Sequence, residues 1–106
     1  MVRKQSSIER TDQDISTTGV IAETTTTGDP IVSLNIEATA AASYAIDVSA
    51  DGETWFEGEV VYDQADVDDA TDIRDTFQVG DARMRVRVTT AASSGETATV
   101  TIQQAH

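Results

Sequence analysis

Apolar residues at every second position constrain the fold of this chain more than any other feature. The clearest case is residues 31–38, where Val32, Leu34 and Ile36 alternate with polar residues. A period of two places the apolar side chains on one face of a β-strand. No stretch of the 106 residues shows a convincing 3.6-residue period, which an amphipathic helix would require. The pattern predicts an all-β protein.

About seven segments carry strand signals, and turn signals separate them. They are residues 19–27, 31–38, 44–49, 54–62, 72–79, 83–89 and 97–103. Asp51-Gly52 predicts a hairpin turn between the third and fourth segments, and Gly58 is a candidate β-bulge. One open sheet of this size would expose a whole apolar face, so two packed sheets are the better solution. We expect a two-sheet antiparallel β-sandwich, either jelly-roll-like or immunoglobulin-like.

Residues 1–18 lack the alternation. They are polar and contain three basic residues, Arg3, Lys4 and Arg10. We therefore expect an extended N-terminal arm outside a sandwich domain that comprises residues 19–106. A basic arm on an otherwise acidic protein is suited to docking against an acidic neighbouring subunit.

Acidic residues greatly outnumber basic ones, with 19 Asp and Glu against 7 Lys and Arg and a formal net charge of −12. Twelve of the acids lie in residues 47–81, together with a single arginine. Because a polyanion would meet a mostly negative surface, we expect no nucleic-acid partner. Many acids and only one lysine are typical of proteins that work in concentrated salt, where charge repulsion is screened. An ordinary acidic domain is the alternative.

Residue types that carry catalysis are scarce. Cysteine is absent, and the only histidine is His106. Disulfides and thiolate metal sites are thereby excluded, and a catalytic triad is not supported. The sequence contains no glycine-rich phosphate loop, membrane-spanning run or secretory signal. We expect a soluble protein made in the cytoplasm, without enzymatic activity, a cofactor or a membrane partner.

The acidic segment 63–71 contains the one candidate metal site. Asp66, Asp68 and Asp69 are closely spaced carboxylates, and Ca²⁺ takes oxygen ligands of this kind. The segment lacks the glycine and the distal glutamate of the helix–loop–helix calcium pattern. A solvated acidic surface is the simpler interpretation, so calcium binding is kept as an alternative.

Three arginines at alternate positions form a row. Arg83, Arg85 and Arg87 share one face of one strand, at intervals of ~6.6 Å. Three like charges in a row call for acidic partners. Neighbouring strands supply them, for example through Asp72 or Asp75, or a separate chain does. The sequence leaves both origins open, and in the second case the row is a protein interface.

Two adjacent aromatic residues, Trp55 and Phe56, follow the hairpin turn. Neighbouring side chains in a strand point to opposite faces, so one ring would lie outward. An outward ring would serve as an interface anchor or a sugar platform. The interpretation that we prefer is that a bulge brings both rings into the core.

Several segments together resemble one group of viral proteins. They are residues 43–49 with Ala50-Asp51-Gly52-Glu53-Thr54-Trp55-Phe56, residues 72–75, residues 83–88 and residues 94–101. Over residues 43–102 the chain resembles small β-sandwich virion proteins of tailed viruses and proviruses of halophilic archaea. The family supplies no catalytic residues.

This resemblance implies a structural protein on the capsid surface, either a decoration or a turret component. Its expected partners are the major capsid protein or other virion proteins, and copies of itself in a homo-oligomer. A tail or adsorption-module protein is one alternative, and a carbohydrate- or calcium-binding module is the other. The candidate interface residues are Arg3, Lys4, Arg10, Trp55, Arg83, Arg85 and Arg87.

Overall fold

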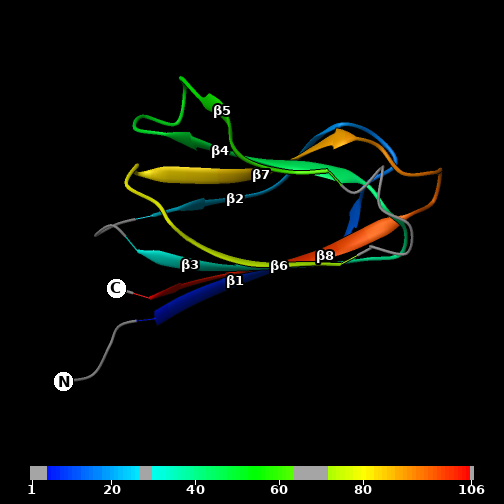
Figure 1. Ribbon diagram of the computed structural model, residues 1–106, viewed down its shortest axis with the longest axis horizontal. Coiled ribbons are helices and arrows are strands. Elements are labelled where there is room, and N and C mark those ends of the chain that lie inside the picture. The colour runs from blue at the N-terminus through cyan, green and yellow to red at the C-terminus, as the bar shows by residue number, and fades with distance from the viewer. Residues whose placement is uncertain (1–4, 27–29, 64–71, 106) are drawn as a thin grey trace.

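The computed structural model describes residues 5–26, 30–63 and 72–105 (Figure 1). The strands are β1 (Gln5–Asp14), β2 (Gly19–Thr25), β3 (Ile31–Ala38), β4 (Ser43–Ser49), β5 (Phe56–Tyr62), β6 (Ile73–Gln78), β7 (Arg83–Thr90) and β8 (Thr97–Ala105). Within these three ranges there is no helix. The prediction of an all-β protein is confirmed for this part of the chain.

The eight strands form two antiparallel sheets of four strands each. One sheet has the order β1-β8-β3-β6 and the other the order β2-β7-β4-β5. Four of the pairings are nested, because β1 pairs with β8, β2 with β7, β3 with β6 and β4 with β5. Figure 1 shows the two sheets as stacked layers. The predicted two-sheet sandwich is confirmed, with eight strands where the sequence indicated about seven.

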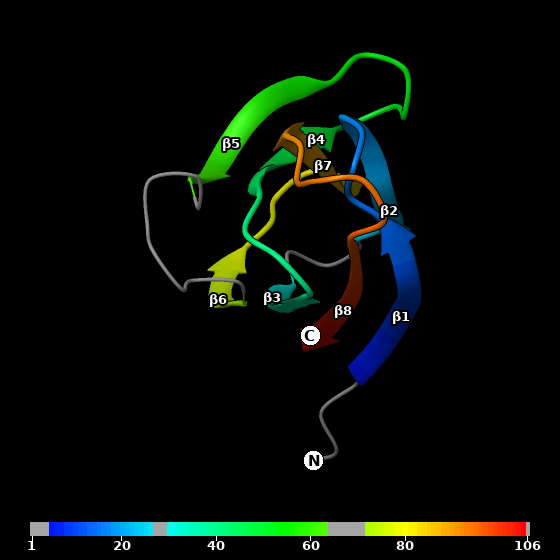
Figure 2. The ribbon, with the colours of Figure 1, turned by 90° about the vertical axis from the view of Figure 1, so that its right-hand side faces the viewer.

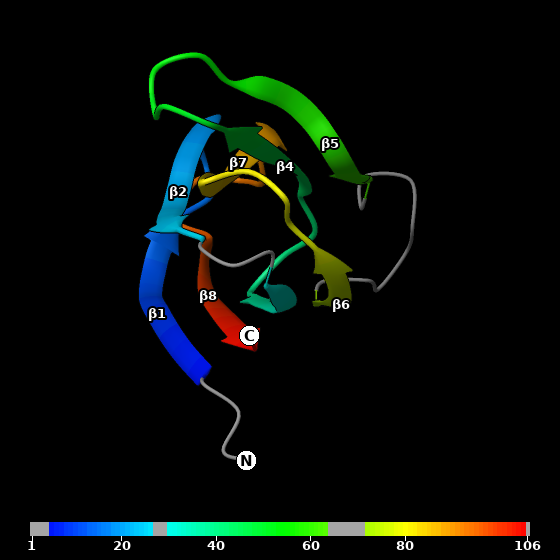
Figure 3. The ribbon, with the colours of Figure 1, turned by 90° about the vertical axis from the view of Figure 1, so that its left-hand side faces the viewer.

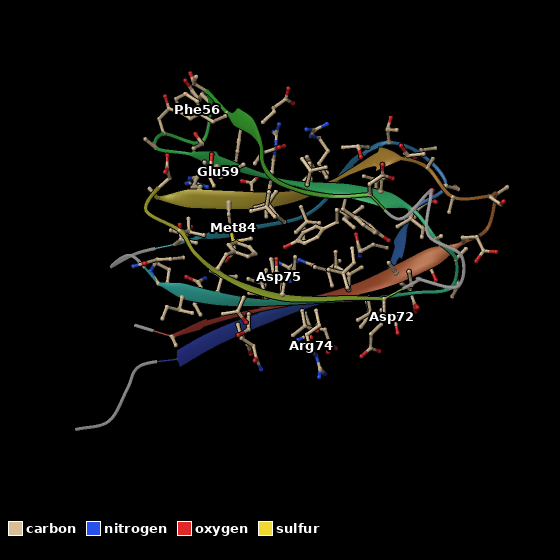
Figure 4. All side chains as sticks on the ribbon, in the orientation of Figure 1. Phe56, Glu59, Asp72, Arg74, Asp75 and Met84 are labelled. Atoms are coloured by element: carbon tan, nitrogen blue, oxygen red, sulfur yellow. The ribbon has the colours of Figure 1, made fainter. Side chains whose placement is uncertain are left out.

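The core lies between the two layers. Every second residue of β3, β7 and β8 is buried, as the alternation in the sequence predicts. Met84 illustrates this placement, since it projects into the space between the sheets (Figure 4). The largest fully buried side chains are Tyr44, Ile15, Leu34, Ile36, Ile46, Met84 and Ile102.

The prediction of an N-terminal arm outside the sandwich is wrong for residues 5–18, the part of the arm that the structure describes. Residues 5–14 form β1, which pairs with β8 at the edge of the first sheet. Ile15 follows and is fully buried in the core. The side chains described in β1 are mostly exposed, so this edge strand has no apolar face that would reveal it in the sequence. Arg3 and Lys4 lie outside the described residues.

The sandwich has two lateral sides, and they differ. On one side, the β1/β2 side, the edge strands β1 and β2 are joined by the short segment 15–18, which contains the buried Ile15. On the opposite side, β5 and β6 are the edge strands of the two sheets (Figure 2, Figure 3). No described strand pairs with the outer edge of β5 or of β6. We call this the β5/β6 side.

Candidate interaction surface

Asp47 lies at the centre of the outer face of the second sheet, and its side chain has no exposed area. Its Oδ2 atom accepts hydrogen bonds from Nε of Arg85 and from Nε of Arg87, both at 2.8 Å. Its Oδ1 atom accepts hydrogen bonds from Nη2 of Arg87 at 3.2 Å and from the backbone N–H of Gly58 at 3.0 Å. Two arginines of β7 and one amide of β5 thus converge on one carboxylate of β4.

The strand register explains this convergence. Strand β4 lies between β7 and β5, and Asp47 pairs directly with Arg85. The pairing of β4 with β5 is irregular next to Asp47, and Gly58 has a φ of 75° there. Glycine adopts a positive φ without the strain that a Cβ atom would cause. The β-bulge predicted at Gly58 is confirmed, and it directs the amide of Gly58 to the carboxylate.

The hydrogen bonds to Asp47 together lower its pKa by more than burial raises it. Burial alone would raise the pKa of this carboxyl, but the hydrogen bonds from Arg87, Arg85 and Gly58 hold the pKa below its ordinary value. The hydrogen bond with Asp47 in turn raises the pKa of Arg87. Glu57 adds a second carboxylate, 3.5 Å from Nη2 of Arg85 and 3.6 Å from Nε of Arg87. Two cations and two anions leave this group, the Asp47 cluster, close to neutral.

The arginine row therefore has partners within the chain. The side chains of Arg85 and Arg87 are only 17% and 25% exposed. The guanidinium of Arg85 also stacks on Trp55, 4.3 Å from the centre of the ring. Arg83 is the most accessible of the three, at 44% exposure, and its Nη1 lies 3.6 Å from the carboxylate of Glu23 in β2.

Of the two origins that the sequence left open, acidic partners on neighbouring strands are confirmed. They are not Asp72 and Asp75, however, because Asp75 lies in β6 of the other sheet and Asp72 directly precedes that strand (Figure 4). Asp72 accepts a hydrogen bond from the backbone N–H of Ala38 at 3.1 Å. Asp75 accepts one from the hydroxyl of Tyr62 at 2.8 Å. An interface role for the arginine row stays a prediction.

Trp55 and Phe56 do not both enter the core, so the preferred interpretation of this pair is wrong. Phe56 is 61% exposed, whereas Trp55 is half-buried against Arg85. Phe56 begins β5, an edge strand in which most residues are exposed, so no second layer covers its ring. Figure 4 shows Phe56 at the periphery of the molecule, far from the space between the two sheets.

The remaining predicted residues are spread over the chain. Arg10 is exposed on β1, and its Nη1 donates to the backbone carbonyl of Glu9 at 3.4 Å. The predicted residues outside the described ranges are Arg3, Lys4, Asp66, Asp68 and Asp69. Within those ranges, no group of three or more His, Cys, Asp or Glu side chains could hold a metal ion. The same part of the chain contains no helix that is long and apolar enough to cross a membrane.

A small, largely apolar cavity opens on the β5/β6 side, with a volume of about 60 Å³. Its lining residues are Ile46, Val48, Glu59, Val60, Phe77, Gln78, Val79, Gly80 and Asp81. On the same side, the hydrogen bond from Tyr62 to Asp75 links β5 to β6. Val61 and Phe56 on β5 are 62% and 61% exposed, more than any other large apolar residue in the described ranges.

Sequence reasoning missed this surface. Its only signal was the adjacent pair Val60-Val61, which breaks the alternation in a segment otherwise rich in glutamate. The structure explains the pair, because Val60 packs against the core and Val61 points outward. The β5/β6 side thus combines free strand edges, an apolar hollow and exposed apolar side chains.

Comparison of the chain with protein-family models, curated proteins and solved structures finds no match. The members of the Asp47 cluster bind one another and fix β5 to β7 through β4. The β5/β6 side has the features of a surface that binds another protein.

Proposed function

We propose that this protein is a structural component of the virion of a haloarchaeal tailed virus. It decorates the capsid surface or forms part of a turret, and it binds the major capsid protein and copies of itself. The observation that carries the proposal is the nested strand order, β1-β8-β3-β6 over β2-β7-β4-β5. This order favours a jelly roll over an immunoglobulin-like sandwich, and jelly rolls are typical of viral capsid domains.

The distribution of charge supports a role in concentrated salt. With a net charge of −12, the surface repels itself in dilute buffer. At ~1 M salt the Debye length falls to roughly 3 Å, so exposed carboxylates no longer interact at a distance. Ion pairs shielded from water, such as those of Asp47, are screened much less. The fold therefore keeps its internal pairs under conditions that remove the surface repulsion.

The proposed mechanism is adhesion. Many symmetric copies each contribute a small interface, and their combined avidity stabilises the coat. Arg10 and Arg83 are the cations with the greatest exposure among the predicted interface residues that the structure describes. The protein is made in the host cytoplasm and incorporated at the capsid surface.

The test is the content of purified particles. Particles induced from a strain that carries the gene are separated on a density gradient and analysed by quantitative mass spectrometry. The proposal expects the chain in the particle fraction at many copies per particle, with immunogold labelling over the heads. Labelling over tails would instead support the alternative that the protein belongs to the tail or adsorption module. A chain that stays in the soluble lysate and is absent from particles would refute a virion role.

A carbohydrate-binding module is a second candidate, because lectin domains share the jelly-roll topology and Phe56 presents an exposed ring. Trp55 is less suited to stack on a sugar, since Arg85 covers one face of its ring. A glycan array with the wild type, Phe56→Ala and Trp55→Ala tests this candidate. Glycan binding that Phe56→Ala abolishes would favour the lectin function, and titration with Ca²⁺ would test the calcium alternative in the same samples.

A further inference from the structure

We infer that the β5/β6 side is a docking surface for an extended, basic segment of another protein subunit, which adds as a strand to the free edge of β5. The inference rests on the proposed function only for the identity of the partner as a virion subunit. The free edge of β5, its exposed apolar side chains and its charge are independent of that function.

The free edge of β5 supplies backbone donors and acceptors. On one side β5 pairs with β4, and no described strand occupies the other side. Five of its seven residues are exposed, so the strand is open along most of its length. A free edge of this kind is a template on which an extended peptide forms main-chain hydrogen bonds.

The cavity beside this edge selects the size of an anchoring side chain. Val60 and Phe77 line it from the facing strands β5 and β6, and Ile46 and Val48 of β4 also contribute apolar surface. A strand added to β5 would direct every second side chain inward, toward this hollow. At about 60 Å³ it is well below the roughly 150 Å³ of a cavity that binds benzene. The cavity thus suits a small aliphatic side chain, such as that of alanine or valine, and excludes an aromatic ring.

Exposed apolar side chains extend the contact outside the cavity. Val61 and Phe56 lie on β5 with more than half of their surface in contact with water. Edge strands of soluble proteins are usually protected by charges or bulges, and β5 has both, at Glu57, Glu59 and Gly58. The two exposed apolar residues on so protected an edge indicate a surface that a partner covers.

The negative charge of this surface favours a positively charged partner. Strand β5 carries no basic residue. Its Glu57 is paired with Arg85 and Arg87, but Glu59 and Asp81 place two carboxylates at the cavity. No lysine or arginine lines the cavity. A second copy that presented its own β5 edge would bring like charges together, which opposes pairing. A segment with alternating basic and small aliphatic residues matches both the carboxylates and the hollow.

The experiment uses the full chain and a blocked nine-residue peptide of alternating lysine and valine as the probe. Calorimetry measures the affinity, and amide chemical shifts locate the binding site. The inference expects saturable binding, with the largest shifts in β5 and β6. A peptide of alternating glutamate and valine is the matched control and should bind at least about ten-fold more weakly.

Two variants of the protein separate this site from general attraction to an acidic surface. Glu59→Lys, at the cavity, should weaken binding of the lysine peptide about ten-fold or more. Glu9→Lys changes the charge equally on the exposed edge strand β1 and should change the affinity less than about two-fold. Phe56→Ser keeps the charge constant and should weaken binding through lost apolar contact.

Equal losses in Glu59→Lys and Glu9→Lys, or shifts centred on the β1/β2 side, would overturn the inference. So would dimerisation in analytical ultracentrifugation that Phe56→Ser abolishes, because a second copy would then occupy the edge. These outcomes are independent of particle content. Peptide binding at β5 by a chain that is absent from particles would refute the virion role alone, and a particle protein that binds no peptide would refute the docking surface alone.

Discussion

The β1/β2 side and the β5/β6 side close the same sandwich by different means. On the β1/β2 side the two edge strands are joined by the short segment 15–18, and Ile15 at its start is fully buried in the core. The N–H of Ile15 donates to the carbonyl of Glu96 at 3.2 Å, and its carbonyl accepts from the N–H of Ala92 at 2.9 Å. On the β5/β6 side, a side-chain hydrogen bond from Tyr62 to Asp75 links the two edge strands.

The difference separates stability from recognition. On the β1/β2 side Ile15 is part of the core, so its surroundings open only when the whole fold opens. On the β5/β6 side most residues of β5 are exposed, and weakly buried segments of this kind are where proteins open locally and bind partners. Substitutions on the two sides should therefore differ in size and in kind.

The largest effect is expected from Ile15→Ala on the β1/β2 side. The substitution removes a fully buried aliphatic side chain and leaves a cavity, at a cost of about 3–4 kcal/mol in the free energy of unfolding. Urea denaturation at fixed salt measures it. Val61→Ala is the matched control on the β5/β6 side and should change stability by less than about 0.5 kcal/mol, because Val61 is exposed. Similar losses in both variants would remove the contrast between the sides.

Asp47→Asn should have the next largest effect, because Asp47 fixes the edge strand β5 to the arginines of β7. The loss should be about 2 kcal/mol in the free energy of unfolding. This is below the usual cost of breaking a buried pair, since Arg85 and Arg87 keep some contact with water. Amide exchange should rise in β5 more than in β1. Unchanged stability would show that the Asp47 cluster does not hold the sheet.

The stability that Asp47 contributes should also depend on pH. The folded-state pKa of Asp47 lies below the ordinary value of 3.8, so its contribution to stability is present above that pH. It is lost as the pH falls from 3.8 through the lower folded-state pKa. The stability difference between wild type and Asp47→Asn should therefore be constant at neutral pH and shrink in acid. Denaturation series at several pH values measure it, and a difference that grows in acid would contradict the assignment.

Tyr62→Phe should weaken the β5/β6 side alone. The variant removes the hydrogen bond to Asp75 and should lower the free energy of unfolding by about 1 kcal/mol, because the site is only partly buried. The expected signature is local, with faster amide exchange in β5 and β6 and no change around Ile15. A uniform increase in exchange over both sheets would show that the two sides are not independent.

Tyr44→Phe is the smallest predicted effect and has the opposite sign. Tyr44 pairs with Tyr62 across β4 and β5, but its hydroxyl is buried without a hydrogen-bond partner among the described residues. Burial, together with the nearby Asp72, raises the pKa of Tyr44 to about 12. Removal of this hydroxyl should leave stability unchanged or raise it by up to about 1 kcal/mol. A loss comparable to that of Tyr62→Phe would mean that the hydroxyl has a partner beyond the described residues.

Alternation in the sequence was sufficient to predict seven strands and the inward faces of β3, β7 and β8. It failed for β1, because an edge strand exposed on most sides has no apolar face to produce a pattern. It also failed at Phe56, whose hydrophobicity suggested the core although it begins an edge strand. The alternation of apolar residues shows which face of a strand is buried. The order of the strands in each sheet is needed to show which strands lie at an edge.

The centre of the candidate site was harder to predict. Asp47 is one of the polar residues that alternate with Tyr44, Ile46 and Val48, and the sequence does not show that the arginines of β7 cover it. The row of three arginines was the correct signal. Its partner could have been found by asking which carboxylate faces outward on a neighbouring strand, but this required the adjacency of β4 and β7. The pairing is a property of the sheet order, which alternation does not encode.

The nested pairing also governs how the molecule is made. Strand β8 lies between β1 and β3, so the first sheet stays in two pieces until residues 97–105 have emerged from the ribosome. Contacts between distant parts of a chain slow folding, and this sheet must wait for the most distant ones. The first sheet is therefore completed only after β8 has left the ribosome, and a chain truncated before β8 would leave β1 without the neighbour with which it pairs.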